Sequence, residues 1–164
     1  GITPDFVVDV IKDNELLQAL NYEDMYYRYA AVYVTENPDG ANFTMNDGVL
    51  NGFLNYISTA DFSYNTNAER ELAQLKKDTE DKMYSEKVKS YISLLEGELK
   101  TEKFKDFESS KPVIAQKLEA EILRRYNKPE KLVVEAGLKE DLQLQEAIRI
   151  IKDRGLYNSL LEPK

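Results

Sequence analysis

Residues 44–57 read TMNDGVLNGFLNYI, and they carry the clearest helical pattern in the chain. Their apolar residues recur three or four positions apart, which places them on one face of a helix: Val49, Leu50, Phe53, Leu54 and Ile57. Thr44 can accept a backbone hydrogen bond at the start of this helix, and Asp47 stands in the first turn, where the helix dipole favours a negative charge. We therefore predict an amphipathic helix whose apolar stripe belongs to the core.

A tyrosine-rich segment precedes this helix. Residues 15–37 keep helical spacing throughout, and we predict a single helix that stops at residues 37–40, which read NPDG. Its tyrosines lie along one stripe: Tyr22, Tyr26, Tyr29 and Tyr33. Such a stripe can form a partner-binding surface, because tyrosine offers a large contact area with a polar tip. It can also line a helix–helix interface within the domain, and we favour this second interpretation.

Two charged segments downstream predict a helical hairpin. Thr66 and Glu69 form a capping-box pattern that opens a helix with few apolar residues, so we expect this helix to be largely solvated. A second helix starts near Ser85 and carries a narrow apolar stripe: Val88, Tyr91, Ile92, Leu95 and Leu99. A narrow stripe on a charged helix is typical of the seam between two antiparallel helices.

Proline and glycine mark the boundaries expected in the last third of the chain. Proline is tolerated only in the first turn of a helix, so we expect a break at residues 108–112 and a new helix after it. Residues 131–138 fit either a loop or a short strand. A final helix is predicted over residues 142–151, with Gly155 as its C-terminal cap. The fold class is therefore all-α, a multi-helix bundle with a long charged helical hairpin.

One short segment departs from this helical pattern. Residues 6–11, FVVDVI, are rich in β-branched residues and predict a strand. No later segment is an obvious partner for it, and a lone strand leaves its backbone groups unpaired. We expect its sheet to belong to a domain outside this chain, which would then begin within a longer protein or after a processing site.

Composition excludes several classes of function. Hydrophobic residues make up 42% of the 164 and charged residues 32%, which suits one globular domain. The net charge of −8 argues against nucleic acid as a partner, and no apolar run approaches the roughly 20 residues needed to insert into a membrane. Without cysteine or histidine, the chain has no Ser-His or Cys-His pair and cannot form the usual zinc sites.

The remaining residue pairs with chemical potential are carboxylate pairs and serine–lysine pairs: Glu119 with Glu121, Asp78 with Asp81, Ser85 with Lys87, and Ser109 with Lys111. Carboxylates among lysines and arginines are typical of solvated helix faces. A Ser-Lys dyad needs a desolvated lysine, whereas these lysines stand in charged stretches. We therefore predict no catalytic, cofactor-binding or metal-binding residue in this chain.

The opening residues, GITPDFVV, resemble the segment that closes the catalytic core of carboxy-terminal processing (tail-specific) serine peptidases, where a Gly-Ile-x-Pro-Asp motif leads into the last core strand. The rest of the chain resembles the helical C-terminal extension of one branch of that family. Four features carry this second resemblance: YYRYA at 26–30, DFSY at 61–64, EILRRY at 121–126 and the Ala147-Ile148 helix.

The resemblance implies that residues 1–12 are the terminal strand of an absent peptidase core and residues 13–164 a helical C-terminal domain that packs on or oligomerises that core. The catalytic Ser-Lys dyad, the oxyanion hole and the PDZ module would lie upstream in the same polypeptide. The full-length protein would cleave polypeptide substrates near their C-termini, in the periplasm or cell envelope, and could form homo-oligomers. The alternative is a stand-alone helical protein-interaction module.

Overall fold

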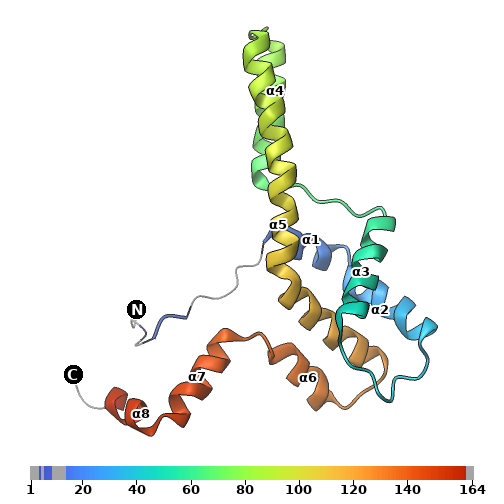
Figure 1. The fold of residues 1–164 in the computed structure, drawn as a ribbon, viewed down its shortest axis with the longest axis vertical. Helices are drawn as coiled ribbons and strands as arrows, with labels where there is room; N and C mark the ends of the chain where they lie inside the picture. Colours follow the sequence, from blue (N-terminus) through green and yellow to red (C-terminus); the bar gives the residue numbers. More distant parts are fainter. Residues whose placement is uncertain (1–3, 5, 9–13, 162–164) are drawn as a thin grey trace.

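The computed structural model describes residue 4, residues 6–8 and residues 14–161. These residues form eight α-helices: α1 (Glu15–Tyr22), α2 (Met25–Glu36), α3 (Asp47–Thr59), α4 (Asn67–Asp81), α5 (Glu86–Arg125), α6 (Glu130–Leu138), α7 (Leu142–Lys152) and α8 (Arg154–Leu161). Figure 1 shows α4 and the first half of α5 projecting as a hairpin from a cluster of the other helices. The predicted all-α fold with a long charged hairpin is confirmed.

The core forms where α1, α2 and α3 pack around the second half of α5. Its fully buried α5 side chains follow one stripe: Ile114, Leu118 and Ile122. Phe53 of α3 is also fully buried, with its ring stacked on Tyr26 and edge-on to Tyr29, each at a centroid distance of 5.4 Å. The stripe predicted for α3 is thus confirmed as the face that joins this core, with Leu54 only partly buried at its edge.

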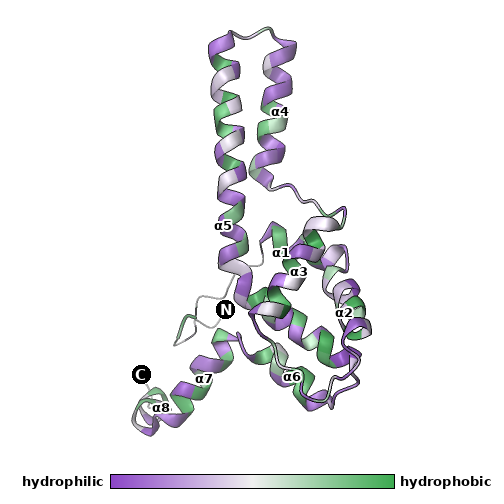
Figure 2. Ribbon diagram, turned by 45° about the vertical axis from the view of Figure 1, so that its right-hand side comes forward, coloured by the Kyte–Doolittle hydropathy of each residue, from purple (hydrophilic) through white to green (hydrophobic). Residues whose placement is uncertain are grey.

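The hairpin has a much thinner interior than the core. Among the residues of α4 and the first half of α5, only Leu72, Thr79 and Ile92 are buried. An ion pair between Lys76 and Glu96, at 3.0 Å, joins the two helices at the surface. The predicted solvation of α4 is confirmed, and Figure 2 shows mostly hydrophilic residues along the arm.

The break predicted at residues 108–112 is wrong. Helix α5 runs unbroken through Pro112, although proline removes one backbone hydrogen bond and strains the preceding turn. The fully buried Ile114 and Leu118 hold the turns after the proline against the core. Figure 1 shows α5 changing direction in this part of the helix, as proline-containing helices do. The bend separates the free arm from the packed half of α5.

The single helix predicted over residues 15–37 is also wrong, because the chain turns between α1 and α2. Asp24 adopts φ 53°, a left-handed conformation that aspartate tolerates better than most residues. The turn lets Leu20 of α1 and Met25 of α2, both buried, face the same core from different directions. Helical spacing continues across the turn, so periodicity alone does not reveal it.

Three local predictions are corrected by the structure. Asn46, rather than Thr44, caps α3, with its Oδ1 accepting from the backbone N–H of Val49 at 3.2 Å. Residues 131–138 form helix α6, neither loop nor strand. Gly155 lies inside α8 and is not a C-terminal cap.

The predicted strand over residues 6–11 falls partly outside the described residues, which leave out 9–13. Phe6 lies in a bend, and Val7 and Val8 have no regular secondary structure. Phe6 and Val7 are exposed. In the part of the chain that the structure describes, no residue belongs to a β-strand.

Candidate binding groove

An apolar groove of about 830 Å³ opens where the hairpin meets the core. Its walls come from the second half of α3, the connection between α3 and α4, and the middle of α5. Aromatic and aliphatic side chains line most of it: Leu54, Ile57, Phe62, Tyr64, Phe104 and Phe107. A concave site of this size and character is typical of binding sites for small molecules or polypeptide segments.

One face of α5 gives the groove its charge pattern. Lys100, Phe104, Phe107 and Lys111 line it at positions i, i+4, i+7 and i+11, which lie on one side of a helix. Two phenylalanines are thus flanked by a lysine at each end. Phe104 is 75% exposed, which is unusual for so large an apolar side chain.

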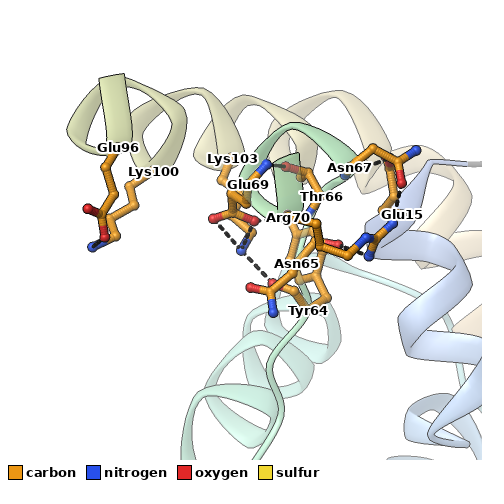
Figure 3. A network of polar contacts seen from close by, with 10 residues as sticks. All are labelled: Glu15, Tyr64, Asn65, Thr66, Asn67, Glu69, Arg70, Glu96, Lys100 and Lys103. Atoms are coloured by element: carbon orange, nitrogen blue, oxygen red, sulfur yellow. Dashed lines mark hydrogen bonds and ion pairs between the residues drawn. The ribbon is translucent and has the colours of Figure 1, made fainter. Parts of the chain in front are cut away.

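The α3–α4 connection is held in place by Lys103 (Figure 3). Its Nζ lies 2.8 Å from a carboxylate oxygen of Glu69, donates to the backbone carbonyl of Tyr64 and stands 4.3 Å from the centre of the Tyr64 ring. Glu69 also completes a capping box with Thr66, as the sequence predicts: Glu69 N–H donates to Thr66 Oγ1 at 3.1 Å, and Thr66 N–H donates to the Glu69 carboxylate at 2.8 Å. One lysine therefore ties α5, the connection and the start of α4 together.

This arrangement shifts two pKa values in opposite directions. Partial burial by itself would raise the pKa of Glu69, but hydrogen bonds from Lys103 and Thr66 outweigh it and hold the pKa below its ordinary value. Burial raises the pKa of the Tyr64 hydroxyl to about 12, and the nearby carboxylates of Asp106 and Glu69 add to the shift. The wall of the groove therefore carries a neutral phenol beside a fixed ion pair at physiological pH.

Most of the tyrosine stripe belongs to the interior. Tyr26 and Tyr29 are buried in the core, and Tyr33 is partly buried against it. The Tyr29 hydroxyl donates to the backbone carbonyl of Val49 on α3 at 3.2 Å. The favoured interpretation, a helix–helix interface, is confirmed for these three residues, whereas Tyr22 is 90% exposed.

Three carboxylates of the two acidic pairs bind a lysine, an arginine or a glutamine side chain. Glu119 accepts from Lys139 at 2.6 Å, and Glu121 forms an ion pair with Arg124. Asp78 accepts from Gln74 at 2.9 Å. Within the described residues, no group of three or more acidic side chains is placed to hold a metal ion.

The serine–lysine pairs are not assembled into dyads. Ser85 precedes α5 as its N-cap residue. Ser109 donates to the carbonyl of Asp106 at 3.1 Å, while Lys111 pairs with Glu108 at 2.8 Å. Ser109 and Lys111 therefore bind groups of their own helix, and no hydrogen bond links a serine to a lysine in either pair.

The groove face of α5 was not identified from the sequence, although its signal is present. The spacing of Lys100, Phe104, Phe107 and Lys111 is regular, but the break predicted at 108–112 includes Lys111 and so separates it from the helix that carries the other three. Phe62 and Tyr64, the two aromatic residues of the connection, are partly buried against the core.

None of the helices in the described part of the chain is long and apolar enough to cross a membrane. No curated protein and no solved structure matches the chain. Residues 16–151 match a family model described as "Probable PDZ-protease, C-terminal helical domain". This match begins in α1, ends in α7 and covers most of the chain, in agreement with the resemblance found in the sequence. The chain therefore belongs to the family of C-terminal helical domains of probable PDZ-proteases.

Proposed function

We propose that this chain is the non-catalytic C-terminal helical domain of a serine-type carboxy-terminal processing peptidase and that it packs on the catalytic core. Residues 1–12 are then the last strand of that core, and residues 13–164 form the helical domain. The Ser-Lys dyad lies upstream and cleaves polypeptides near their C-termini. We place the full-length protein in the periplasm or cell envelope.

The family match over residues 16–151 is the observation that carries this proposal. The local chemistry agrees with it, because neither Ser85, the N-cap residue of α5, nor Ser109, within α5, is hydrogen-bonded to the lysine of its pair. An activated serine needs a base in direct contact. A helical domain of this kind can position a catalytic core without taking part in the chemistry.

The test compares the isolated chain with the full-length polypeptide on a fluorescein-labelled unfolded protein. We expect cleavage by the full-length polypeptide and none by the isolated chain. Alanine at the upstream nucleophile should abolish cleavage, whereas Ser85→Ala and Ser109→Ala should leave it unchanged. Hydrolysis by the isolated chain that disappears in either of these two variants would contradict the proposal.

A second function, capture of an acidic and apolar polypeptide segment, is favoured by the groove. Lys100 and Lys111 are 11 residues apart, about 16 Å along a helix, with two phenylalanines between them. This pattern complements a segment that has apolar side chains between two carboxylates. Lys111 is paired with Glu108 at 2.8 Å and Lys100 with Glu96 at 3.7 Å, so both lysines would have to exchange partners on binding.

Fluorescence anisotropy with a labelled peptide tests this second function. The probe carries two phenylalanines between glutamates, and the matched control has lysines in place of the glutamates. Saturable binding is expected only for the acidic probe, and Phe104→Asp should weaken its affinity at least tenfold. Phe104 is exposed, so its replacement does not disturb the core. Equal binding of both probes, or no effect of Phe104→Asp, would exclude specific capture.

A further inference from the structure

The two last helices carry an apolar surface that no other part of the described structure buries. We call it the C-terminal apolar face, and it consists of Ile148 and Ile151 on α7 with Tyr157 and Leu161 on α8. Their side chains are 42%, 64%, 43% and 67% exposed, in that order. Neither helix contains a buried residue. Both helices therefore lie in the described structure without a core of their own.

The spacing of the apolar residues in α7 is that of a helix face that packs against a partner. Leu144, Ile148 and Ile151 recur at i, i+4 and i+7, the spacing with which a helix packs one stripe against a core. The polar side is well satisfied: Asp141 caps the helix at 2.9 Å, and Glu146 pairs with Arg149 at 2.6 Å. An isolated helix of 11 residues is only marginally stable in water, so a stripe of this kind indicates a covering partner.

The position of the chain's first described residues indicates which partner this is. In Figures 1 and 2, Phe6–Val8 and the α7–α8 pair lie on the same side of the molecule, away from the hairpin and from α2 and α3. The family description is that of a C-terminal domain of probable PDZ-proteases, so under the proposed function the protease core would be joined through residues 6–8. The upstream domain would therefore be tethered on the side of the molecule that carries the exposed face.

A second copy of the chain is a poorer candidate for this position. Helices α7 and α8 have 11 and 8 residues, of which only a part can face one partner. A stable interface between separate molecules takes about 20–30 residues from each partner. A small face can still hold a tethered domain, because a short connection raises its effective concentration to about the millimolar range.

We propose that the C-terminal apolar face docks on the upstream protease core of the same polypeptide. The inference rests on the proposed function and names the surface through which the helical domain packs on the core. Ile148 and Ile151 are its central contacts, with Tyr157 and Leu161 extending it along α8. In the full-length protein, docking keeps α7 folded and withdraws its stripe from water.

Hydrogen–deuterium exchange of the full-length polypeptide tests this docking. We expect the amides of α7 to be protected in the wild type and to exchange at least tenfold faster after Ile148→Arg combined with Ile151→Arg. The matched control is Met83→Arg combined with Tyr91→Arg on the hairpin, where both side chains are also exposed. The control should leave α7 protection unchanged, and neither double variant should alter exchange of the buried helices α1 and α3.

Three outcomes would overturn the docking. Fast exchange of α7 in the wild type would show that nothing covers the face, and equal protection in wild type and Ile148→Arg/Ile151→Arg would show that these residues do not hold it. Protection that depends on protein concentration would assign the face to a second copy. Failure of the proposed function has a different signature, namely a full-length polypeptide whose cleavage activity does not depend on an upstream serine.

Discussion

Gly52→Ala should destabilise the domain, although the same change stabilises most helices. Gly52 lies in α3, and the Tyr29 hydroxyl of α2 occupies the space that an alanine Cβ would need, well inside van der Waals contact. The same hydroxyl donates to Val49 O at 3.2 Å, next to Gly52 on α3. A methyl group at Gly52 would therefore displace a buried tyrosine that joins two helices of the core.

The magnitude follows from three contributions. Replacing glycine by alanine in a helix contributes about 1 kcal/mol of stability. Losing the Tyr29 hydrogen bond costs about 0.5–1.5 kcal/mol, and forcing an extra methyl group into a packed core costs about 1–3 kcal/mol. The net loss is centred near 2 kcal/mol, which for a domain of this size lowers the melting midpoint by about 4–8 °C.

Thermal melting followed by circular dichroism measures this effect, and Gly97→Ala is the matched control. Gly97 also lies inside a helix, but a Cβ built there meets nothing within 4 Å. Its replacement should raise stability by about 1 kcal/mol. In a Tyr29→Phe background, which lacks the hydroxyl, Gly52→Ala should reduce stability much less than it does in the wild type. Equal stabilisation by both glycine substitutions would refute the packing described for Tyr29.

Three further predictions concern the core, the hairpin turn and the groove. Phe53→Ala should cost about 3–5 kcal/mol in chemical denaturation, whereas Leu54→Ala, at the partly exposed edge, should cost about 1–2 kcal/mol; equal costs would contradict the burial pattern. Met83→Gly should raise stability by about 0.5–1 kcal/mol, because Met83 adopts φ 51° and is 88% exposed, while Lys82→Gly at φ −93° should lower it. The pKa of Glu69 is lowered on folding from 4.5, so the stability that its charge contributes is fully present above about pH 4.5 and disappears as the pH falls through the lowered value. The stability difference between wild type and Glu69→Gln, which keeps the capping box, should follow that course, and a difference that grows on acidification would have the wrong sign.

The regular spacing of apolar residues predicts many of the helices of this fold from sequence, because residues three or four positions apart lie on the same face of a helix. The α3 stripe around Phe53 and the capping box at Thr66 are both found where the pattern places them. The resemblance to the C-terminal extension of processing peptidases also agrees with the family match.

The missed features are those in which tertiary packing outweighs a local signal. Pro112 normally ends a helix, but the buried residues that follow it keep α5 continuous. The helical spacing of apolar residues continues across the turn at Asp24, so the spacing does not predict the turn. Residues 131–138 form a helix because Val133 and Ala136 are buried beside Leu123, a partner that local sequence does not show. The groove was missed for the first of these reasons, since Phe104 and Phe107 precede the expected break at residues 108–112 and Lys111 lies within it.

The hairpin beyond the bend in α5 can change length without changing the core. Its outer part is joined to the rest of the domain only through its own two helices (Figure 1), and its tip turns over the exposed Met83. Such tips tolerate insertions and deletions well. Removing seven residues, about two turns, from each helix would shorten the arm by about 10 Å and keep the register of its apolar seam. The reach of the domain is therefore a dimension that evolution or an engineer can adjust independently of the packing that lets it fold.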